Sequence, residues 1–254
     1  MEKLRDEIVA WIKDWFERNG KGCKAVIGIS GGKDSSVAAA LCARALGPEN
    51  VIGVSMPDSQ QGTNNAKEIC EALGIEYILA PIGGIIYGFS FLEDVMFKKT
   101  AEDKVKNLIF SGQAKQNIPP RVRMTMLYAI SQANNGRVCG TCNLSENWIG
   151  YATRWGDSVS DFEPLANLTC SEVIELGLTM PELKEEWIRR KPDDGLPGSM
   201  PDEEKFGFTY AVLDKYIRTG ECSDEKIKEK IDKMHKDNAF KMKMPECFEN
   251  KKED

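Results

Sequence analysis

Residues Ser30–Ser35, which read SGGKDS, have the composition of a loop that holds phosphate groups. An apolar run over 24–29 precedes them and a run of small and apolar residues over 36–46 follows, a pattern that predicts a strand, a tight loop and a helix. Adjacent glycines allow backbone N–H groups to approach a ligand closely, and the N-terminus of the next helix is positively polarised. A glycine turn that binds nothing is the alternative, but the serines and the aspartate at the same turn favour a phosphate site.

Two acidic residues are candidates for a magnesium site. Asp34 directly follows the lysine of the loop, which distinguishes this loop from the longer G-x-x-x-x-G-K-[ST] phosphate loop. Glu146 follows the predicted strand 137–141 with its Gly-Thr and, taken alone, is expected to be a surface residue. Because neighbouring parallel strands end at one edge of a sheet, the two carboxylates can meet there and hold Mg²⁺ against the phosphates of ATP.

A third group of residues combines positive charge with an aromatic ring. Arg121 and Arg123 lie at the start of a predicted helix over 120–134, and Tyr128 follows in the same helix. Arginines two residues apart on a helix point in different directions, so they suit two different anionic groups, and a tyrosine can stack on a flat ring. A solvated basic turn with a core tyrosine is the alternative. Because His235 is the only histidine, a catalytic triad would rest on it alone, and histidine metal clusters are excluded.

The composition excludes several classes of protein. A length of 254 residues suits one large domain, and contents of 41% hydrophobic and 29% charged residues are ordinary for a globular protein. The net charge of −6 argues against a nucleic-acid partner, and no apolar stretch is long enough to span a membrane. The eight cysteines are scattered and the N-terminus is too charged for a signal peptide, so we expect a reduced, cytoplasmic setting. Cys139 and Cys142 form a C-x-x-C pair, but without a second pair they favour packing over metal binding.

The hydrophobic pattern predicts the α/β class, with a single doubly wound parallel sheet and helices on both of its faces. The predicted strands cover 24–29, 51–57, 76–82 and 137–141. The predicted helices of this part cover 4–18, 36–46, 64–73 and 120–134, whereas 83–118 show no clear period. A helical C-terminal part follows, with predicted helices over 170–178, 181–190, 208–218 and 223–236. We expect one domain over 1–254, opened by a helix within 1–20, with a mobile lid over 191–207 and a frayed tail over 248–254.

Several motifs together resemble those of one enzyme family. They are SGGKDSSV from Ser30, N-x-x-x-R-x-R-M-x-x-x-Y from Asn117, GT-x-x-x-x-E from Gly140, the RWGD run from Arg154, and His235 with its neighbour Lys236 in a late helix. In this order and spacing they resemble the ammonia-dependent NAD synthetases of the PP-loop ATP pyrophosphatase superfamily. The first motif is shared by the whole superfamily and the later ones are specific to the family. The resemblance covers about residues 24–240, nearly the whole chain.

The resemblance implies an amide-forming ligase with a Rossmann-like fold of the adenine nucleotide alpha-hydrolase type. Such enzymes use ATP and Mg²⁺ to convert the nicotinate carboxylate of deamido-NAD into an acyl-adenylate, and ammonia then displaces AMP to give NAD, in the last step of NAD biosynthesis. No covalent enzyme nucleophile is required, and a homodimer is implied. No glutaminase-like segment precedes the loop in this sequence, so we expect free ammonia, or ammonia from a separate partner, as the nitrogen source.

The resemblance also implies roles for individual residues. Those implied to contact ATP are Gly28, Ile29, Ser30, Gly31, Gly32, Lys33, Asp34, Ser35, Met56, Arg123, Thr141 and Cys170. Those implied to contact deamido-NAD are Asn117, Arg121, Tyr128, Arg154, Asp161, His235 and Lys236. Asp34 and Glu146 are implied to hold Mg²⁺. Asp157 lies where the family places a carboxylate near the amide-forming centre, and we expect it to orient ammonia or accept its proton.

Three departures from the common pattern of the family affect charge and geometry. Arg154 and Trp155 stand where many members have Lys-Tyr, and Arg keeps the charge but changes the hydrogen-bond geometry. Cys170 stands where many members carry a phosphate-binding lysine, and Asp193 where a Thr or Ser often contacts ATP. These changes weaken ATP binding unless another lysine substitutes; the candidates are Lys33, Lys191 and Lys205.

Three alternative functions share the phosphate loop. A tRNA sulfur-transferase would use Cys139 and Cys142, but the acidic net charge and the lack of an RNA-binding extension count against it. A core like that of GMP synthetase fits the RWGD segment from Arg154 less well. A nucleotide sensor without catalysis would be consistent with Cys170 and Asp193, and it would bind ATP without releasing pyrophosphate.

Overall fold

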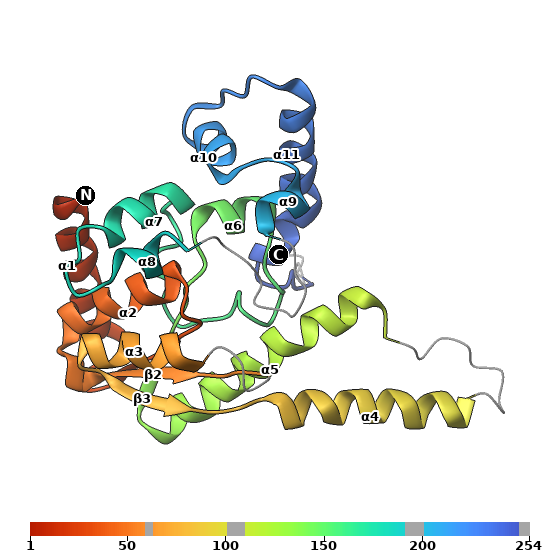
Figure 1. Ribbon diagram of the computed structural model, residues 1–254, viewed down its shortest axis with the longest axis horizontal. Coiled ribbons are helices and arrows are strands. Elements are labelled where there is room, and N and C mark those ends of the chain that lie inside the picture. The colour runs from red at the N-terminus through yellow and green to blue at the C-terminus, as the bar shows by residue number, and fades with distance from the viewer. Residues whose placement is uncertain (59–62, 101–109, 191–200, 249–254) are drawn as a thin grey trace, which may run out of the picture.

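The computed structural model describes residues 1–58, 63–100, 110–190 and 201–248 (Figure 1). Its sheet has four parallel strands in the order β3-β2-β1-β4. They are β1 (Lys24–Gly28), β2 (Val51–Ser55), β3 (Glu76–Leu79) and β4 (Gly136–Cys139). In this register Val26 of β1 lies opposite Ile52 of β2 and Val138 of β4. The carboxyl ends of all four strands therefore lie at one edge of the sheet, the edge where open α/β sheets bind their ligands.

Helices cover both faces of the sheet, because β1 alternates its apolar side chains between two clusters. Ala25 and Ile27 pack with α2 (Lys33–Leu46) and α3 (Thr63–Leu73). Val26, between them, packs on the opposite face with side chains of α5 (Gly112–Ala133). Outside α2 lie α1 (Glu2–Asn19), α7 (Cys170–Gly177) and the short α8 (Glu185–Ile188), and η1 (Pro48–Asn50) leads into β2. The predicted doubly wound sheet is confirmed.

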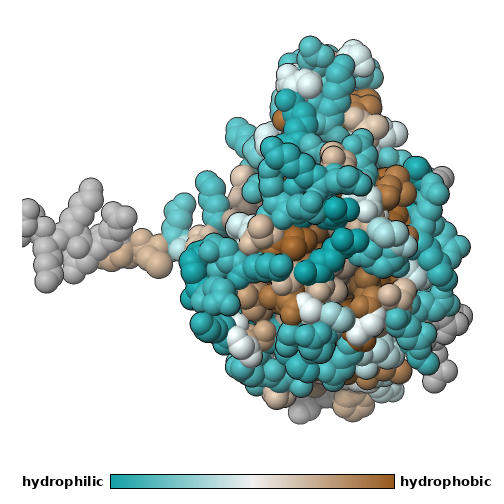
Figure 2. Space-filling view, turned by 90° about the vertical axis from the view of Figure 1, so that its left-hand side faces the viewer, coloured by the Kyte–Doolittle hydropathy of each residue, from teal (hydrophilic) through white to brown (hydrophobic). Residues whose placement is uncertain are grey.

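The surface on the α1 side is largely polar. Figure 2 shows this side, where hydrophilic residues cover most of the face and hydrophobic residues appear near its middle. The inner side of α1 supplies Ile12 and Phe16 to the core, and the ring of Trp15 lies 4.9 Å from that of Phe162. Among the described helices, none combines the length and the apolar composition that crossing a bilayer requires.

Two helices lie between β3 and β4 in the chain, and in Figure 1 the first of them extends away from the sheet. The first, α4 (Gly83–Thr100), occupies a region whose sequence shows no clear period. The second, α5, begins at Gly112 rather than at the predicted residue 120. The predicted start is wrong because Ser111 caps the helix by accepting a hydrogen bond from the N–H of Ala114, and the helix then continues through Pro119 and Pro120. A proline pair normally marks a helix start, but here tertiary packing overrides that preference.

The remaining helices pack together, and apart from the first of them, which was not predicted, they belong with α7 to the predicted helical C-terminal part. They are α6 (Leu144–Ile149), α9 (Asp202–Phe206), α10 (Tyr210–Thr219), α11 (Glu225–Asn238) and the 3₁₀ helix η2 (Ala239–Met242). Buried side chains that include Phe206, Leu213 and Ile231 hold them together. The predicted helix over 181–190 is helical only in α8.

The predicted lid and tail are only partly described. Of the lid, 191–200, which include Lys191 and Asp193, lie outside the described residues, and 201–207 contain α9, whose Phe206 is buried. Of the tail, 249–254 lie outside the described residues, and Phe248 is exposed.

Candidate active site

The loop after β1 has the backbone shape of an anion site. Gly31 adopts φ +85°, and a Cβ atom at this position would lie 3.0 Å from the Cβ of Asn65. Gly32 is the N-cap of α2, so the first backbone N–H groups of that helix face the loop. A side chain at Gly31 would meet both backbone strain and a neighbouring residue, so the turn requires glycine there.

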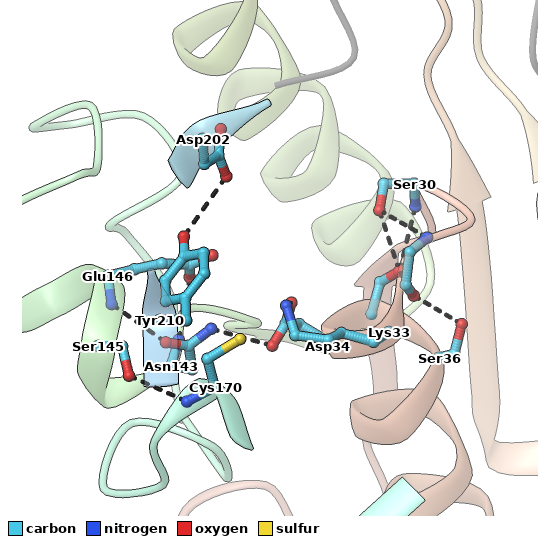
Figure 3. Close-up of polar contacts among 12 residues, drawn as sticks. Ser30, Lys33, Asp34, Ser36, Asn143, Ser145, Glu146, Cys170, Asp202 and Tyr210 are labelled. Carbon is cyan, nitrogen blue, oxygen red and sulfur yellow. Dashed lines mark hydrogen bonds and ion pairs between the residues drawn. The ribbon is translucent and has the colours of Figure 1, made fainter. Parts of the chain in front are cut away.

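Serine hydroxyls hold the loop in this shape (Figure 3). The Oγ of Ser30 accepts a hydrogen bond from the N–H of Gly32 at 3.2 Å and lies 3.2 Å from the Oγ of Ser35. Ser35 and Ser36 both donate to the carbonyl of Gly32, at 3.2 and 2.7 Å. The loop is therefore preorganised by contacts within the chain.

Lys33 is a buried cation at the first position of α2. Its side chain is only 3% exposed, and its Nζ lies 2.9 Å from Oδ2 of Asp34 and 5.8 Å from the centre of the Tyr210 ring. Burial by itself lowers the pKa of Lys33, but the charge and the hydrogen bond of the adjacent Asp34 act in the opposite direction, and the pKa lies above the ordinary value. The ammonium group therefore stays charged at neutral pH.

Asn143 joins the two predicted magnesium ligands. Its Nδ2 donates to Oδ1 of Asp34 at 3.1 Å, and its Oδ1 accepts from the N–H of Glu146 at 3.1 Å. The carboxylate of Glu146 in turn accepts from the N–H of Asn143 at 3.2 Å, which completes a capping box at the start of α6. Asp34 and Glu146 are thus both bonded to Asn143, the first through its side-chain amide and the carboxylate of the second through its backbone N–H. Asn143 is not among the predicted site residues, although the sequence shows the N-x-x-E spacing that is typical of a capping box.

The charge at this junction suits a divalent cation. Burial and the neighbouring Asp34 raise the pKa of Glu146 to about 8, because a single ammonium group serves two carboxylates. Oxygen donors with excess negative charge are what Mg²⁺ prefers. Within the described ranges no cluster of three or more His, Cys, Asp or Glu residues is arranged to hold a metal, so phosphate and water oxygens would have to complete the coordination.

Cys170 lies beside the same charges, at the start of α7. Its backbone N–H donates to Oγ of Ser145 at 2.9 Å, and Ser145 donates to Asp214 at 2.5 Å. The side chain is 2% exposed, and burial raises the pKa of the thiol to about 12. A neutral thiol therefore faces Lys33 at neutral pH.

A second group of predicted residues meets in the loop after α6. The Oδ1 of Asp157 accepts from the N–H of Thr153 at 2.7 Å, and the hydroxyl of Thr153 donates to Oδ1 of Asn117 at 2.8 Å. Burial raises the pKa of Asp157, while Lys241 and Arg123 act in the opposite direction through their charges. Lys241, whose Nζ donates to the carbonyl of Gly150 at 2.9 Å, was missed, and nothing in the local sequence marks it.

The two arginines of α5 diverge, as their spacing predicts. Arg121 donates to the carbonyl of Arg154 at 3.3 and 3.4 Å, whereas Arg123 donates to the carbonyl of Met56 at 3.2 Å. Met56, at the end of β2, also packs its side chain toward Gly28 of β1. Arg123 therefore belongs with the sheet edge, and Arg121 with the loop that carries Asp157.

The side chains of Tyr128 and Asp161 are hydrogen-bonded to each other. The Tyr128 hydroxyl donates to Oδ1 of Asp161 at 3.2 Å, and Oδ2 of Asp161 accepts from the N–H of Val138 in β4 at 2.7 Å. Both oxygens of Asp161 are thus engaged in linking α5 to the sheet. Thr141 lies half-buried in the loop after β4.

The other predicted contacts to the dinucleotide lie around two aromatic stacks. The guanidinium of Arg154 lies 5.0 Å from the Trp155 ring and 5.2 Å from the Phe240 ring. The His235 ring stacks on Trp148 at 4.4 Å, and its Nδ1 lies 2.8 Å from the Trp148 carbonyl oxygen. Lys236 follows on the exposed side of α11. His235 is therefore placed on α11 against Trp148 of α6, with Lys236 next to it in the same helix.

Comparison with known proteins identifies the family. The sequence profile of the NAD synthase family matches residues 4–245. The chain belongs to the NAD synthase family. It is 39% identical over 210 residues to an NH3-dependent NAD(+) synthetase of Methanococcus aeolicus, a match that covers 83% of this chain and 79% of the relative.

Solved structures agree with this assignment. The chain is similar to an NMN synthetase from Francisella tularensis, with a TM-score of 0.83, 29% identity and coverage of 98% of both chains. It is also similar to an NH3-dependent NAD synthetase from Campylobacter jejuni, with a TM-score of 0.73, 29% identity and coverage of 98% of this chain and 99% of the other. The fold and the family predicted from the motifs are confirmed, and so is the class of enzyme, an ammonia-dependent ligase that makes NAD.

The raised pKa of Glu146 predicts a pH-dependent stability. Below its ordinary value of 4.5 the carboxyl is protonated in both the folded and the unfolded state, and between 4.5 and about 8 only the unfolded state ionises freely. The folded state therefore loses stability as pH rises through this window. Glu146→Gln keeps the capping box and removes the charge, so the metal-free variant should be more stable than the parent by about 1–3 kcal/mol at pH 8 and closely matched near pH 4. Urea unfolding at pH 4 and pH 8 measures the difference in the free energy of unfolding between variant and parent. The same difference at both pH values would contradict the raised pKa of Glu146.

Proposed function

We propose that this chain joins ammonia to the nicotinate carboxylate of deamido-NAD, at the expense of ATP, to form NAD, AMP and pyrophosphate. One observation carries the proposal: the glycine-turn loop, Lys33, Asp34 and Glu146 converge at the carboxyl edge of the sheet through Asn143. This arrangement combines backbone donors, a buried cation and two carboxylates within one site, which is the set of groups that a bound triphosphate with its metal requires.

Activation of the carboxylate is the first step of the proposed reaction. The substrate carboxylate attacks the α-phosphorus of ATP, the bond to the β-phosphate bridging oxygen breaks, and pyrophosphate leaves with the electron pair. The backbone N–H groups of Ser30–Lys33 and the ammonium of Lys33 would bind the phosphates and stabilise the departing charge. Asp34 and Glu146 would hold Mg²⁺, which supplies charge neutralisation at the phosphates when bound.

Amide formation is the second step. Ammonia attacks the carbonyl carbon of the acyl-adenylate, AMP leaves, and the nitrogen loses a proton. We assign Asp157 the role of orienting ammonia or accepting that proton, because burial raises its pKa and Thr153 fixes its carboxylate. The surrounding residues Asn117, Arg121 and Arg154 are suited to position the dinucleotide by hydrogen bonds and charge.

The roles proposed for the remaining predicted residues follow from where they lie in the fold. Gly28, Ile29, Met56 and Thr141 lie at or shortly after strand ends, where the adenosine part of ATP would bind, and Arg123 reaches this edge from α5 by donating to the carbonyl of Met56. For the dinucleotide, Tyr128 and Asp161 would act through the shape of α5 against β4, since they are bonded to each other, while His235 and Lys236 would contact it from α11.

The mononucleotide is the second candidate substrate. The similarity to an NMN synthetase, with a TM-score of 0.83, makes deamido-NMN a reasonable acceptor of ammonia in the same site. The reaction class and the ATP-binding residues would be unchanged, and the two candidates differ only in whether a second nucleotide is bound.

Two further properties are proposed. All eight cysteines are free thiols, which supports a reducing, cytoplasmic setting. Helix α4 presents large apolar side chains to solvent, with Tyr87 72% and Phe91 56% exposed, which supports burial of this face in a homodimer.

The reaction makes a direct prediction about substrates. With deamido-NAD, ATP and Mg²⁺, the purified chain should release NAD and pyrophosphate in equal amounts when ammonium is supplied, and should show little activity when glutamine replaces it. EDTA should abolish the reaction, because the phosphate charge is then left without its metal. A parallel reaction with deamido-NMN tests the second candidate substrate. NMN formation that is faster than NAD formation would make the mononucleotide the substrate. Pyrophosphate release without either product would overturn both.

Asp157→Asn should slow amide formation about 10²–10⁴-fold, since the amide side chain keeps the bond to Thr153 and cannot take a proton. The KM for ATP should remain close to that of the parent, because Asp157 lies outside the phosphate loop. Rapid-quench measurement of acyl-adenylate and NAD separates the two steps, and adenylate should accumulate. Asp14→Asn, on α1, whose carboxylate pairs with Arg18 at 2.9 Å, serves as the control. NAD formation at the parental rate would remove the assigned role.

The exposed face of α4 predicts the oligomeric state. The double variant Tyr87→Asp and Phe91→Asp places charges on adjacent turns of one helix face, so it should halve the mass of the homodimer. Leu178→Asp, at the exposed end of α7 and remote from α4 in Figure 1, should leave the mass unchanged. Light scattering after size-exclusion chromatography gives the answer. A parent chain that is monomeric at micromolar concentration would refute the homodimer.

A further inference from the structure

Asp34 is fully occupied before any ligand binds. Its Oδ2 pairs with the ammonium of Lys33 at 2.9 Å and its Oδ1 accepts the amide of Asn143 at 3.1 Å (Figure 3). A cation that uses Asp34 as a ligand must therefore displace one of these partners. Asn143 is also the N-cap residue of α6 and part of its capping box. Losing the hydrogen bond from Asn143 would therefore disturb the fold more than losing the ion pair with Lys33.

The other carboxylate near Lys33 is Glu146, which is itself a proposed metal ligand, so a shift toward it would not take Lys33 away from a bound metal. The Tyr210 ring lies 5.8 Å from the Nζ of Lys33, whose side chain is only 3% exposed. The next carboxylate beyond that ring, Asp202, accepts hydrogen bonds from Tyr151 at 3.0 Å and Tyr210 at 3.4 Å. Cys170, on the remaining side, is buried and carries a thiol rather than an acid.

From this geometry we propose that Lys33 is a built-in counter-ion that competes with the divalent metal for Asp34, so that metal binds tightly only together with a triphosphate. A metal ion that enters alone brings two positive charges against a buried ammonium. A triphosphate supplies oxygens to the metal and gives the ammonium new anionic partners at the N-terminus of α2. Metal and ATP are then coupled through one side chain, and each raises the affinity for the other. This inference rests on the proposed function, which makes Asp34 a metal ligand.

The test uses Mn²⁺ as a probe of the metal site, measured by electron paramagnetic resonance on the full chain without nucleotide. Lys33→Met removes the charge and keeps the length of the side chain. It should bind Mn²⁺ at least about ten-fold more tightly than the parent, because the repulsion is gone and Oδ2 of Asp34 is released. Lys24→Met is the matched control: Lys24 also pairs with a carboxylate, that of Glu76 at 3.1 Å, but at the amino end of β1. Its Mn²⁺ affinity should equal that of the parent.

A second measurement adds α,β-methylene-ATP, which cannot be split at the reacting bond. The factor by which this nucleotide tightens Mn²⁺ binding should be smaller in Lys33→Met than in the parent. Lys33→Gln, which keeps a donor for Asp34 without charge, provides the same comparison if Lys33→Met does not fold. Mn²⁺ binding by the folded variant that is no tighter than that of the parent would overturn the inference. Because the readout is metal binding, failure of NAD formation by the parent would count against the proposed function and leave this comparison intact.

Discussion

The structure depends on keeping two carboxylates together at the end of a parallel sheet. Asp34 begins α2 and Glu146 lies in α6, more than a hundred residues later, and like charges held this close oppose folding. Lys33 offsets the charge, and Asn143 fixes the geometry by donating its side-chain amide to Asp34 and its backbone N–H to the carboxylate of Glu146. The raised pKa of Glu146 shows that the compensation is incomplete, and a bound cation would offset this cost by favouring the ionised carboxylate.

A second set of contacts ties this junction to the C-terminal helices. Asp214 of α10 accepts hydrogen bonds from Ser145 of α6 and from the N–H of Ser171 in α7, at 2.5 and 2.8 Å. Three helices thus meet on one buried carboxylate directly behind Cys170. Because buried acceptors are costly when unpaired, this contact fixes the relative positions of the helices that carry Glu146, Cys170 and Tyr210. The loop of Ser30–Ser35 positions backbone N–H groups, and the C-terminal helices supply Tyr210 and Cys170, which pack beside Lys33.

The sheet and the phosphate-loop part of the site could be predicted from the sequence, because their signals are local. The strand, glycine turn and helix around Ser30–Ser35 are encoded within about twenty consecutive residues, and parallel topology then brings the strand ends to one edge. What could not be predicted depends on contacts between distant segments. Helix α5 begins at Gly112 because Ser111 caps it and tertiary packing tolerates Pro119 and Pro120, whereas the proline pair alone suggests a start there. Tyr210 and Lys241 enter the site from helices whose local patterns show only an apolar face.

The position of the phosphate-binding cation illustrates the same limit. Many family members carry a lysine where this chain has Cys170. From the sequence, Lys33, Lys191 and Lys205 were the candidates to supply that charge instead. Lys191 lies outside the described residues, and Lys205 on α9 bonds to the Tyr151 hydroxyl at 3.2 Å. Lys33 alone of the described candidates is buried between the carboxylates and the loop. A cation at that position belongs to α2 itself, so its charge moves with the phosphate-binding helix rather than with α7. We therefore infer that Lys33 is the described residue placed to supply the charge missing at 170, whereas Cys170 is a neutral packing residue of the helical part.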